Sequence, residues 1–305
     1  MDSKTRLFTT LFRVMERVPD RLAIRLASAI AGLLSSRDTT ARQTVETNVR
    51  ALLRANAGDA PIDDALVRRL VRRNFQTYGR YWAEGATLAG VDGHNLASRM
   101  VIGEGEELLR SALLTGNGVV LALPHVGSWE WGGAFLAHAG MPMTAVAERL
   151  EPEELFQFFV EKREAMGLGV IPLGPEAGSA LMKHLKNGGL VGLLCDRDIA
   201  GGGQEATLFG RGVTVPKGPA TLAIRTGATL LVGVVYSGPD GQHLAVIHGP
   251  IDTSRRDGLR ADVERVTHEV TFELEQLIAR APDQWHVFQP IFTAPAIPAG
   301  PGVHP

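Results

Sequence analysis

The sequence predicts an α/β fold in which a central, mainly parallel sheet is flanked by helices on both faces and preceded by an N-terminal helical region. Three observations predict it. Residues 3–85 carry apolar positions at helical spacing, short apolar runs alternate with helical stretches after residue 95, and 45% of the 305 residues are hydrophobic while 21% are charged. Strands that alternate with helices form parallel sheets covered on both faces, and this composition is typical of a globular protein.

The N-terminal region, residues 1–90, is predicted to consist of amphipathic helices that belong to the same fold. The helices are expected at 5–18, 20–36, 41–55 and 63–86. The region contains 15 Lys and Arg against 9 Asp and Glu, whereas the whole chain has a net charge of -2. Amphipathic helices with Arg can lie in a membrane interface and meet anionic headgroups. We predict such peripheral contact for the first two helices; a solvated helical face whose apolar side packs on the core is the alternative.

Residues 91–292 form the predicted α/β core. Six apolar runs are expected to be strands: 118–124, 143–148, 168–173, 190–195, 229–236 and 243–249. Helices are expected around them near 104–115, 129–138, 152–166, 176–186, 217–227 and 257–280. In open sheets of this kind, ligands bind at the carboxyl ends of the strands. The last segment, 293–305, is rich in Pro and Gly and is predicted to be disordered.

Composition disfavours several classes of protein. Cys195 is the only cysteine, so no internal disulfide is possible. The net charge of -2 does not indicate nucleic-acid binding. The histidines show no zinc-site spacing, and we expect neither a metal nor a cofactor. The longest apolar stretch, LAIRLASAIAGLL, is interrupted by Arg25 and is shorter than the roughly 18–20 residues that span a bilayer.

The stretch LALPHVGSWEWGG, residues 121–133, contains the principal candidate site. His125 directly follows an apolar strand, and Glu130 lies in the helix expected next. If His125 lies in the turn and the helix begins near Ser128, the chain can fold back so that Glu130 reaches a ring nitrogen. A carboxylate that fixes an imidazole in this way makes it a general base for a hydroxyl. The alternative is that His125 caps a turn and Glu130 faces solvent.

Charged residues also end the strand predicted at 190–195. Asp196 and Arg197 follow it in the string LLCDRDIAGGG and are therefore expected at the same edge as His125. Both are candidate substrate-binding residues, with Arg197 as a candidate ligand of an anion. The glycine run at 201–203 is a further candidate for phosphate, with a mobile loop as the alternative.

No G-x-S-x-G nucleophile elbow is present in the sequence. The simplest chemistry for the His125 site is therefore direct attack of an activated substrate hydroxyl on a donor carbonyl.

The string PHVGSWEWGG resembles the H-x₄-[DE] motif of the glycerolipid acyltransferase superfamily. Its surroundings resemble the bacterial branch that contains the lipid A acyltransferases and the phosphatidylinositol mannoside acyltransferases, with the mannoside enzymes the most similar. The supporting blocks are LALPHVGSWEWGG, TAVAERLEPEELFQFFVEKREAMGLGVIPL, GPATLAIRTGATLL and PDQWHVFQP. The resemblance extends from about residue 5 to residue 292.

The resemblance implies transfer of a fatty acyl chain from acyl-CoA to a mannose hydroxyl of an anionic phosphatidylinositol mannoside, at the cytoplasmic face of the inner membrane. His125 would be the base and Glu130 its orienting partner, with acyl-CoA as co-substrate. Glu148 and Arg163 match a charged pair in the second block. Arg163 would bind a phosphate or headgroup, and Glu148 would hold Arg163 or a sugar hydroxyl; a purely structural ion pair is the alternative.

Three other functions remain open from the sequence. The same chemistry can act on a different glycolipid, including lipid A. Water can replace the acceptor hydroxyl, which would make the protein an acyl-thioester hydrolase. A non-catalytic lipid carrier would need the cavity but not the base.

Overall fold

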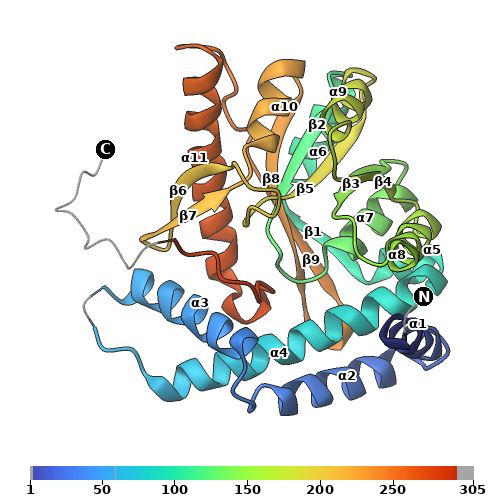
Figure 1. Ribbon diagram of the computed structural model, residues 1–305. Helices are drawn as coiled ribbons and strands as arrows, with labels where there is room; N and C mark the ends of the chain where they lie inside the picture. The colour runs from blue at the N-terminus through green and yellow to red at the C-terminus, as the bar shows by residue number, and fades with distance from the viewer. Residues whose placement is uncertain (1–2, 59, 294–305) are drawn as a thin grey trace.

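The computed structural model describes residues 3–58 and 60–293, and its N-terminal region is a layer of helices that runs past one end of the sheet (Figure 1). The helices are α1 (Ser3–Met15), α2 (Asp20–Leu34), α3 (Thr40–Ala57) and α4 (Asp64–Thr87). Thr39 and Asp63 cap α3 and α4, each accepting a hydrogen bond from a backbone N–H of the first turn. Gly79 allows α2 and α4 to pack closely, because a Cβ there would lie 2.5 Å from the carbonyl oxygen of Ala27.

The main sheet has seven strands. They are β1 (Met100–Glu104), β2 (Val119–Leu123), β3 (Met143–Ala147), β4 (Gly169–Pro172), β5 (Leu190–Leu194), β8 (Thr229–Ser237) and β9 (His243–His248). Their order in the sheet is β1-β9-β8-β2-β5-β3-β4. The last five run parallel to one another, while β9 is antiparallel to β8 and pairs in parallel with β1. The predicted fold class, a mainly parallel sheet with an N-terminal helical region, is confirmed.

Helices cover both faces of this sheet (Figure 1). The remaining helices are α5 (Gly93–Ser98), α6 (Glu106–Leu114), α7 (Trp129–His138), α8 (Glu153–Ala165), α9 (Ala177–Lys186), α10 (Gly218–Thr226) and α11 (Leu259–Arg280). All residues of β2 are buried because they alternate between two cores. Val120 and Ala122 pack with α9, α10 and α11, whereas Leu121 and Leu123 pack with α6 and α7 on the other face.

Three strands are not predicted by the sequence analysis. β1 is an edge strand in which Met100 alone is buried, so its apolar pattern is weak. β6 (Gln204–Leu208) and β7 (Arg211–Val215) form an antiparallel hairpin outside the main sheet. Buried and less buried residues alternate in both strands, and their sequences are short and less apolar than those of the core strands.

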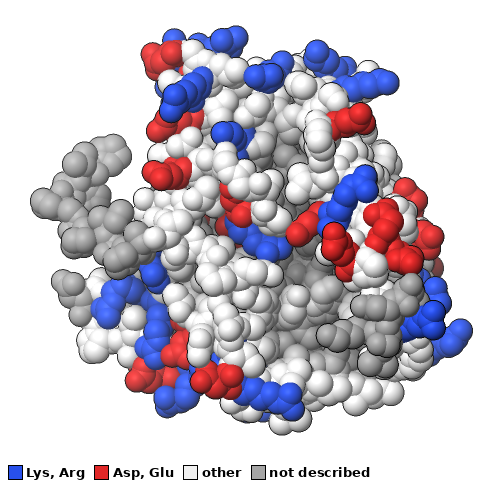
Figure 2. Space-filling view, in the orientation of Figure 1, with Lys and Arg blue, Asp and Glu red and all other residues white. Residues whose placement is uncertain are grey.

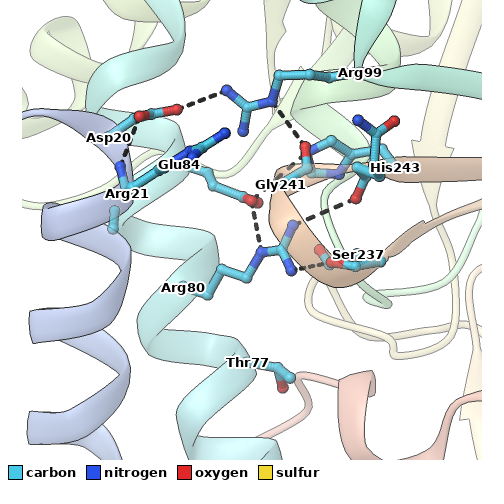
Figure 3. A network of polar contacts seen from close by, with 12 residues as sticks. Asp20, Arg21, Thr77, Arg80, Glu84, Arg99, Ser237, Gly241 and His243 are labelled. Carbon is cyan, nitrogen blue, oxygen red and sulfur yellow. Dashed lines mark hydrogen bonds and ion pairs between the residues drawn. The ribbon is translucent and has the colours of Figure 1, made fainter.

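A polar network joins the helical layer to the turn between β8 and β9 (Figure 3). Arg99, just before β1, donates to Asp20 at the start of α2 at 2.7 Å and to the carbonyl oxygen of Gly241 at 2.8 Å. Arg80 of α4 donates to Glu84 at 2.6 Å and to a carbonyl of the β8–β9 turn at 2.5 Å. These contacts fix α2 and α4 against the sheet.

The C-terminal segment begins with an ordered contact, since the backbone N–H of Thr293 donates to the carbonyl oxygen of Gly212 at 2.8 Å. The rest of the segment predicted to be disordered, 294–305, lies outside the described residues. Within the described part of the chain, no helix has both the length and the apolarity needed to cross a membrane.

Candidate active site

His125 lies in the turn between β2 and α7, at the carboxyl edge of the parallel strands. β2 ends at Leu123 and α7 begins at Trp129. Gly127 in this turn has a φ of +61°, and a Cβ there would lie 2.0 Å from the carbonyl oxygen of Val235. Only glycine fits this tight turn without a clash, and the position predicted for His125 is confirmed.

Asp196, which follows β5, holds the ring of His125. β5 pairs in parallel with β2, with Leu194 opposite Leu123, so the two strand ends bring both residues to the same edge. Nδ1 of His125 lies 2.5 Å from Oδ1 of Asp196, and the backbone N–H of His125 donates to Oδ2 at 3.0 Å. The His125 side chain is 17% exposed, whereas Asp196 is 1% exposed. Nδ1 therefore faces the carboxylate, and Nε2 has no hydrogen bond among the described residues.

The environment of Asp196 favours its ionised form. Burial opposes ionisation, yet the His125 ring, the His125 backbone N–H and the Trp285 indole together hold the pKa of the carboxyl below its ordinary value. The indole Nε1–H of Trp285 donates to Oδ2 at 2.7 Å. An ionised, fully hydrogen-bonded carboxylate is suited to stabilise an imidazolium at His125.

The contact predicted between Glu130 and His125 is not formed in the described residues. Glu130 lies in the first turn of α7, is buried, and its Oε1 accepts a hydrogen bond from Nε of Arg163 at 2.9 Å. Asp196, predicted to bind substrate, makes the contact with the ring instead. The spacing of five residues places Glu130 on a helix that packs toward α8, whereas strand pairing places Asp196 beside the ring.

Arg163 on α8 is the counter-ion of Glu130. Burial alone would lower the pKa of Arg163, but the Glu130 carboxylate and Tyr81 raise it, so the guanidinium stays charged. Its guanidinium carbon also lies 5.3 Å from the centre of the Trp129 ring. The predicted pair of Arg163 with Glu148 is not formed among the described residues, because Arg163 pairs with Glu130 instead.

Arg197 lies at the same sheet edge as Asp196, as predicted. Its Nη1 donates to Oε1 of Gln289 at 2.6 Å, and its Nε is buried without a partner in the described part of the chain. Two of the three amides of the glycine run next to it already have an acceptor. Asp198 accepts hydrogen bonds from the N–H groups of Gly201 and Gly203 at 3.0 and 2.8 Å.

Two cavities flank the first turn of α7. The apolar one lies between α7 and the sheet, and Leu123 and Trp129, on either side of the His125 turn, both line it. The polar one is lined by Glu130 and Arg163 together with aromatic side chains and Lys162. Trp129 therefore borders the apolar cavity and its neighbour Glu130 the polar one.

Trp285 and the contact of Asp196 with the His125 ring are the parts of the site that sequence reasoning misses. Both residues belong to strings that the sequence analysis singles out, CDRD and PDQWHVFQP. Nothing in their spacing from His125 indicates contact, because Asp196 is 71 and Trp285 is 160 positions further along the chain.

Comparison with known proteins agrees with the predicted resemblance. The model of the family "bacterial lipid A biosynthesis acyltransferase" matches residues 4–294. A phosphatidylinositol mannoside acyltransferase of Mycolicibacterium smegmatis is 36% identical over 228 residues, covering 74% of this chain and 73% of that protein. A phosphatidylinositol mannoside acyltransferase of Mycobacterium tuberculosis is 37% identical over 230 residues, covering 74% of this chain and 71% of that protein. The chain belongs to the bacterial lipid A biosynthesis acyltransferase family and is an O-acyltransferase.

Proposed function

We propose that the protein transfers a fatty acyl chain from acyl-CoA to a mannose hydroxyl of a phosphatidylinositol mannoside, with His125 as general base and Asp196 as its orienting partner. The observation that carries the chemistry is the His125–Asp196 pair, which engages Nδ1 and leaves Nε2 without a hydrogen bond among the described residues. Leu123 and Trp129, on either side of the His125 turn, line the apolar cavity. The acceptor class rests on the names of the relatives.

The reaction follows from the two ring nitrogens. Nδ1–H donates to Asp196, so Nε2 is the acceptor. Nε2 takes the proton of the sugar hydroxyl as its oxygen attacks the thioester carbonyl carbon. The tetrahedral intermediate collapses, the C–S bond breaks, and the imidazolium returns the proton to the coenzyme A sulfur. Asp196 stabilises the imidazolium between these steps.

We assign the two cavities to the two lipid substrates. The apolar cavity suits the acyl chain of the donor, because its lining is formed by side chains such as Leu121, Leu136 and Ile247. The polar cavity suits the acceptor headgroup. Arg163 and Lys162 line it as ion pairs with Glu130 and Glu16, and polar headgroups can exchange hydrogen bonds with such pairs. Tyr81 and Trp82 supply aromatic faces for a sugar ring. Glu130 holds Arg163 in this arrangement.

Peripheral contact with the cytoplasmic face of an anionic membrane completes the proposal. On α2, Leu22, Leu26, Ile30 and Leu33 follow helical spacing and are exposed, Leu33 to 70%. Figure 2 shows a largely uncharged stretch along the lower edge, where Figure 1 places α2, with Lys and Arg on either side. Exposed apolar side chains rimmed by basic ones are typical of a surface that meets lipid.

The test is incubation with radiolabelled acyl-CoA and a panel of glycolipids, followed by mass analysis of the products. An acylated phosphatidylinositol mannoside is the expected product. Acylation of lipid A precursors instead would change the acceptor class. Coenzyme A release that is equally fast without any glycolipid would indicate a thioester hydrolase, and binding without turnover would indicate a lipid carrier.

A further inference from the structure

The segment that follows α11 lies next to the N-terminal helices α3 and α4 (Figure 1), and it contacts both the His125 turn and Asp196. Trp285, in this segment, is 2% exposed, and its indole N–H donates to Oδ2 of Asp196 at 2.7 Å. The other carboxylate oxygen, Oδ1, faces Nδ1 of His125. Oδ2, which does not face the ring, therefore accepts from two donors, the Trp285 indole and the backbone N–H of His125 at 3.0 Å.

The backbone of the same segment holds the His125 turn. The N–H of His286 donates to the carbonyl oxygen of His125 at 2.7 Å, and the N–H of Gly127 donates to the carbonyl oxygen of Gln284 at 3.1 Å. Val126 and Trp285 form an isolated antiparallel bridge. Both members of the pair, the acid and the ring, are therefore held by the segment around Trp285.

Buried amides of the N-terminal helices hold the segment from the other side. Nδ2 of Asn74 on α4 donates to the carbonyl oxygen of Trp285 at 2.8 Å, and Nδ2 of Asn48 on α3 donates to that of Val287 at 3.0 Å. Thr77 on α4 donates to the carbonyl oxygen of Asp283 at 2.5 Å. These donors precede the segment by more than 200 positions along the chain. They fix its position because they satisfy its backbone carbonyl groups.

We propose that Trp285 is a positioning residue for the acyl transfer. Its indole N–H fixes the carboxylate of Asp196 so that Oδ1 faces Nδ1 of His125, and Asn74 fixes Trp285. The physical reason is that the carboxylate torsion of Asp is broad and roughly two-fold. Without the indole, Oδ2 keeps only the backbone N–H of His125 at 3.0 Å, which holds the buried carboxylate less tightly than the two donors together. The inference rests on the proposed role of His125 as base.

The alternative is that Trp285 only fills space, since its ring packs edge-on against Phe209 at 5.6 Å. Trp131 provides a matched control. It is 1% exposed, and its Nε1 has no hydrogen-bond partner within the described residues. Trp285→Phe and Trp131→Phe thus remove the same atoms from two buried tryptophans, but only the first removes a hydrogen bond to Asp196.

The first readout is the pH dependence of turnover. We expect Trp285→Phe to lower kcat by about 10–100-fold, the usual worth of a hydrogen bond to a charged group, with little change in KM. We also expect the acid limb of the pH profile to move to higher pH, because a less stabilised carboxylate at Asp196 favours the protonated ring. Trp131→Phe is expected to keep the wild-type limb. The same limb in both variants, or equal losses of kcat, would overturn the proposal.

Two further measurements keep the test decisive if Trp285→Phe does not fold. Replacement of Trp285 by 3-benzothienylalanine keeps the shape of the indole and removes only the N–H, and the same shift is expected. The low-field proton resonance of Nδ1–H, assigned by its loss in His125→Gln, is expected to move in this variant and not in Trp131→Phe. Because the resonance needs no substrate, an unmoved signal refutes the positioning role whatever reaction the enzyme catalyses.

A double-mutant cycle shows through which residue Trp285 acts. If it acts through the carboxylate, Trp285→Phe is expected to change kcat several-fold less in an Asp196→Asn background than in the wild type. The same fold-change in both backgrounds would mean that Trp285 acts independently of Asp196, and would contradict the proposal.

Discussion

Replacement of Asp196 by Asn is expected to remove most of the turnover while the fold survives. The amide is nearly isosteric, and its oxygen still accepts from the Trp285 indole, but its nitrogen faces Nδ1 of His125. Nδ1 then has to accept, the ring proton moves to Nε2, and Nε2 cannot take a proton from the hydroxyl. In the Ser-His-Asp triad of serine proteases the same change lowers kcat about 10⁴-fold, a barrier increase of about 5 kcal/mol. We expect roughly 10³–10⁴-fold here.

The assay is steady-state transfer of a radiolabelled acyl chain at saturating acceptor, with urea unfolding as the check on the fold. Glu130→Gln is the matched control for Asp196→Asn, because it neutralises the carboxylate that the sequence, but not the structure, pairs with His125. It leaves the partly buried Arg163 without its counter-charge, and we expect it to cost about 3 kcal/mol of unfolding free energy. Its loss of kcat on folded enzyme is expected to be smaller than that of Asp196→Asn. Near-normal turnover in Asp196→Asn, with the large loss in Glu130→Gln, would refute the assignment.

Three other predictions concern the base, the membrane face and the pH dependence of stability. His125→Ala is expected to lower kcat by about 10²–10⁴-fold in the same assay, and wild-type turnover would contradict its role as base. Ile30→Asp combined with Leu33→Asp is expected to weaken cosedimentation with anionic vesicles at least about tenfold, because both apolar side chains are exposed. Added salt is expected to weaken the binding of the wild type to the same vesicles. Unchanged binding of the double variant would place the membrane contact elsewhere. Burial lowers the pKa of His243 and of His286 to about 3 in the folded protein, so between pH 6.5 and pH 5 only the unfolded chain takes up protons there, and stability falls as the pH falls. Each histidine is expected to contribute about 2 kcal/mol to the fall in unfolding free energy over this interval. Urea unfolding of His243→Gln should therefore show an unfolding free energy that depends on pH about half as steeply as that of the wild type. A wild-type unfolding free energy that does not change with pH would contradict the burial of both rings.

The sequence alone determined the secondary structure of the core and the place of His125. Apolar runs such as 190–195 and 229–236 are long and β-rich enough to be recognised as strands, and helical periodicity is equally local. His125 was predicted at a strand end because it directly follows the apolar run 118–124. The edge strand β1 and the β6–β7 hairpin escaped prediction because partial exposure dilutes their apolar pattern.

Only the tertiary structure decided which carboxylate serves His125. Glu130 is five residues away along the chain and Asp196 is 71, yet Asp196 makes the contact. The strand that follows β2 along the chain is β3, but the strand beside β2 in the sheet is β5, and its end carries Asp196. Strand order depends on how two cores pack on opposite faces of the sheet, which is a property of the whole chain. Local spacing places residues on an element, and long-range packing determines which elements meet.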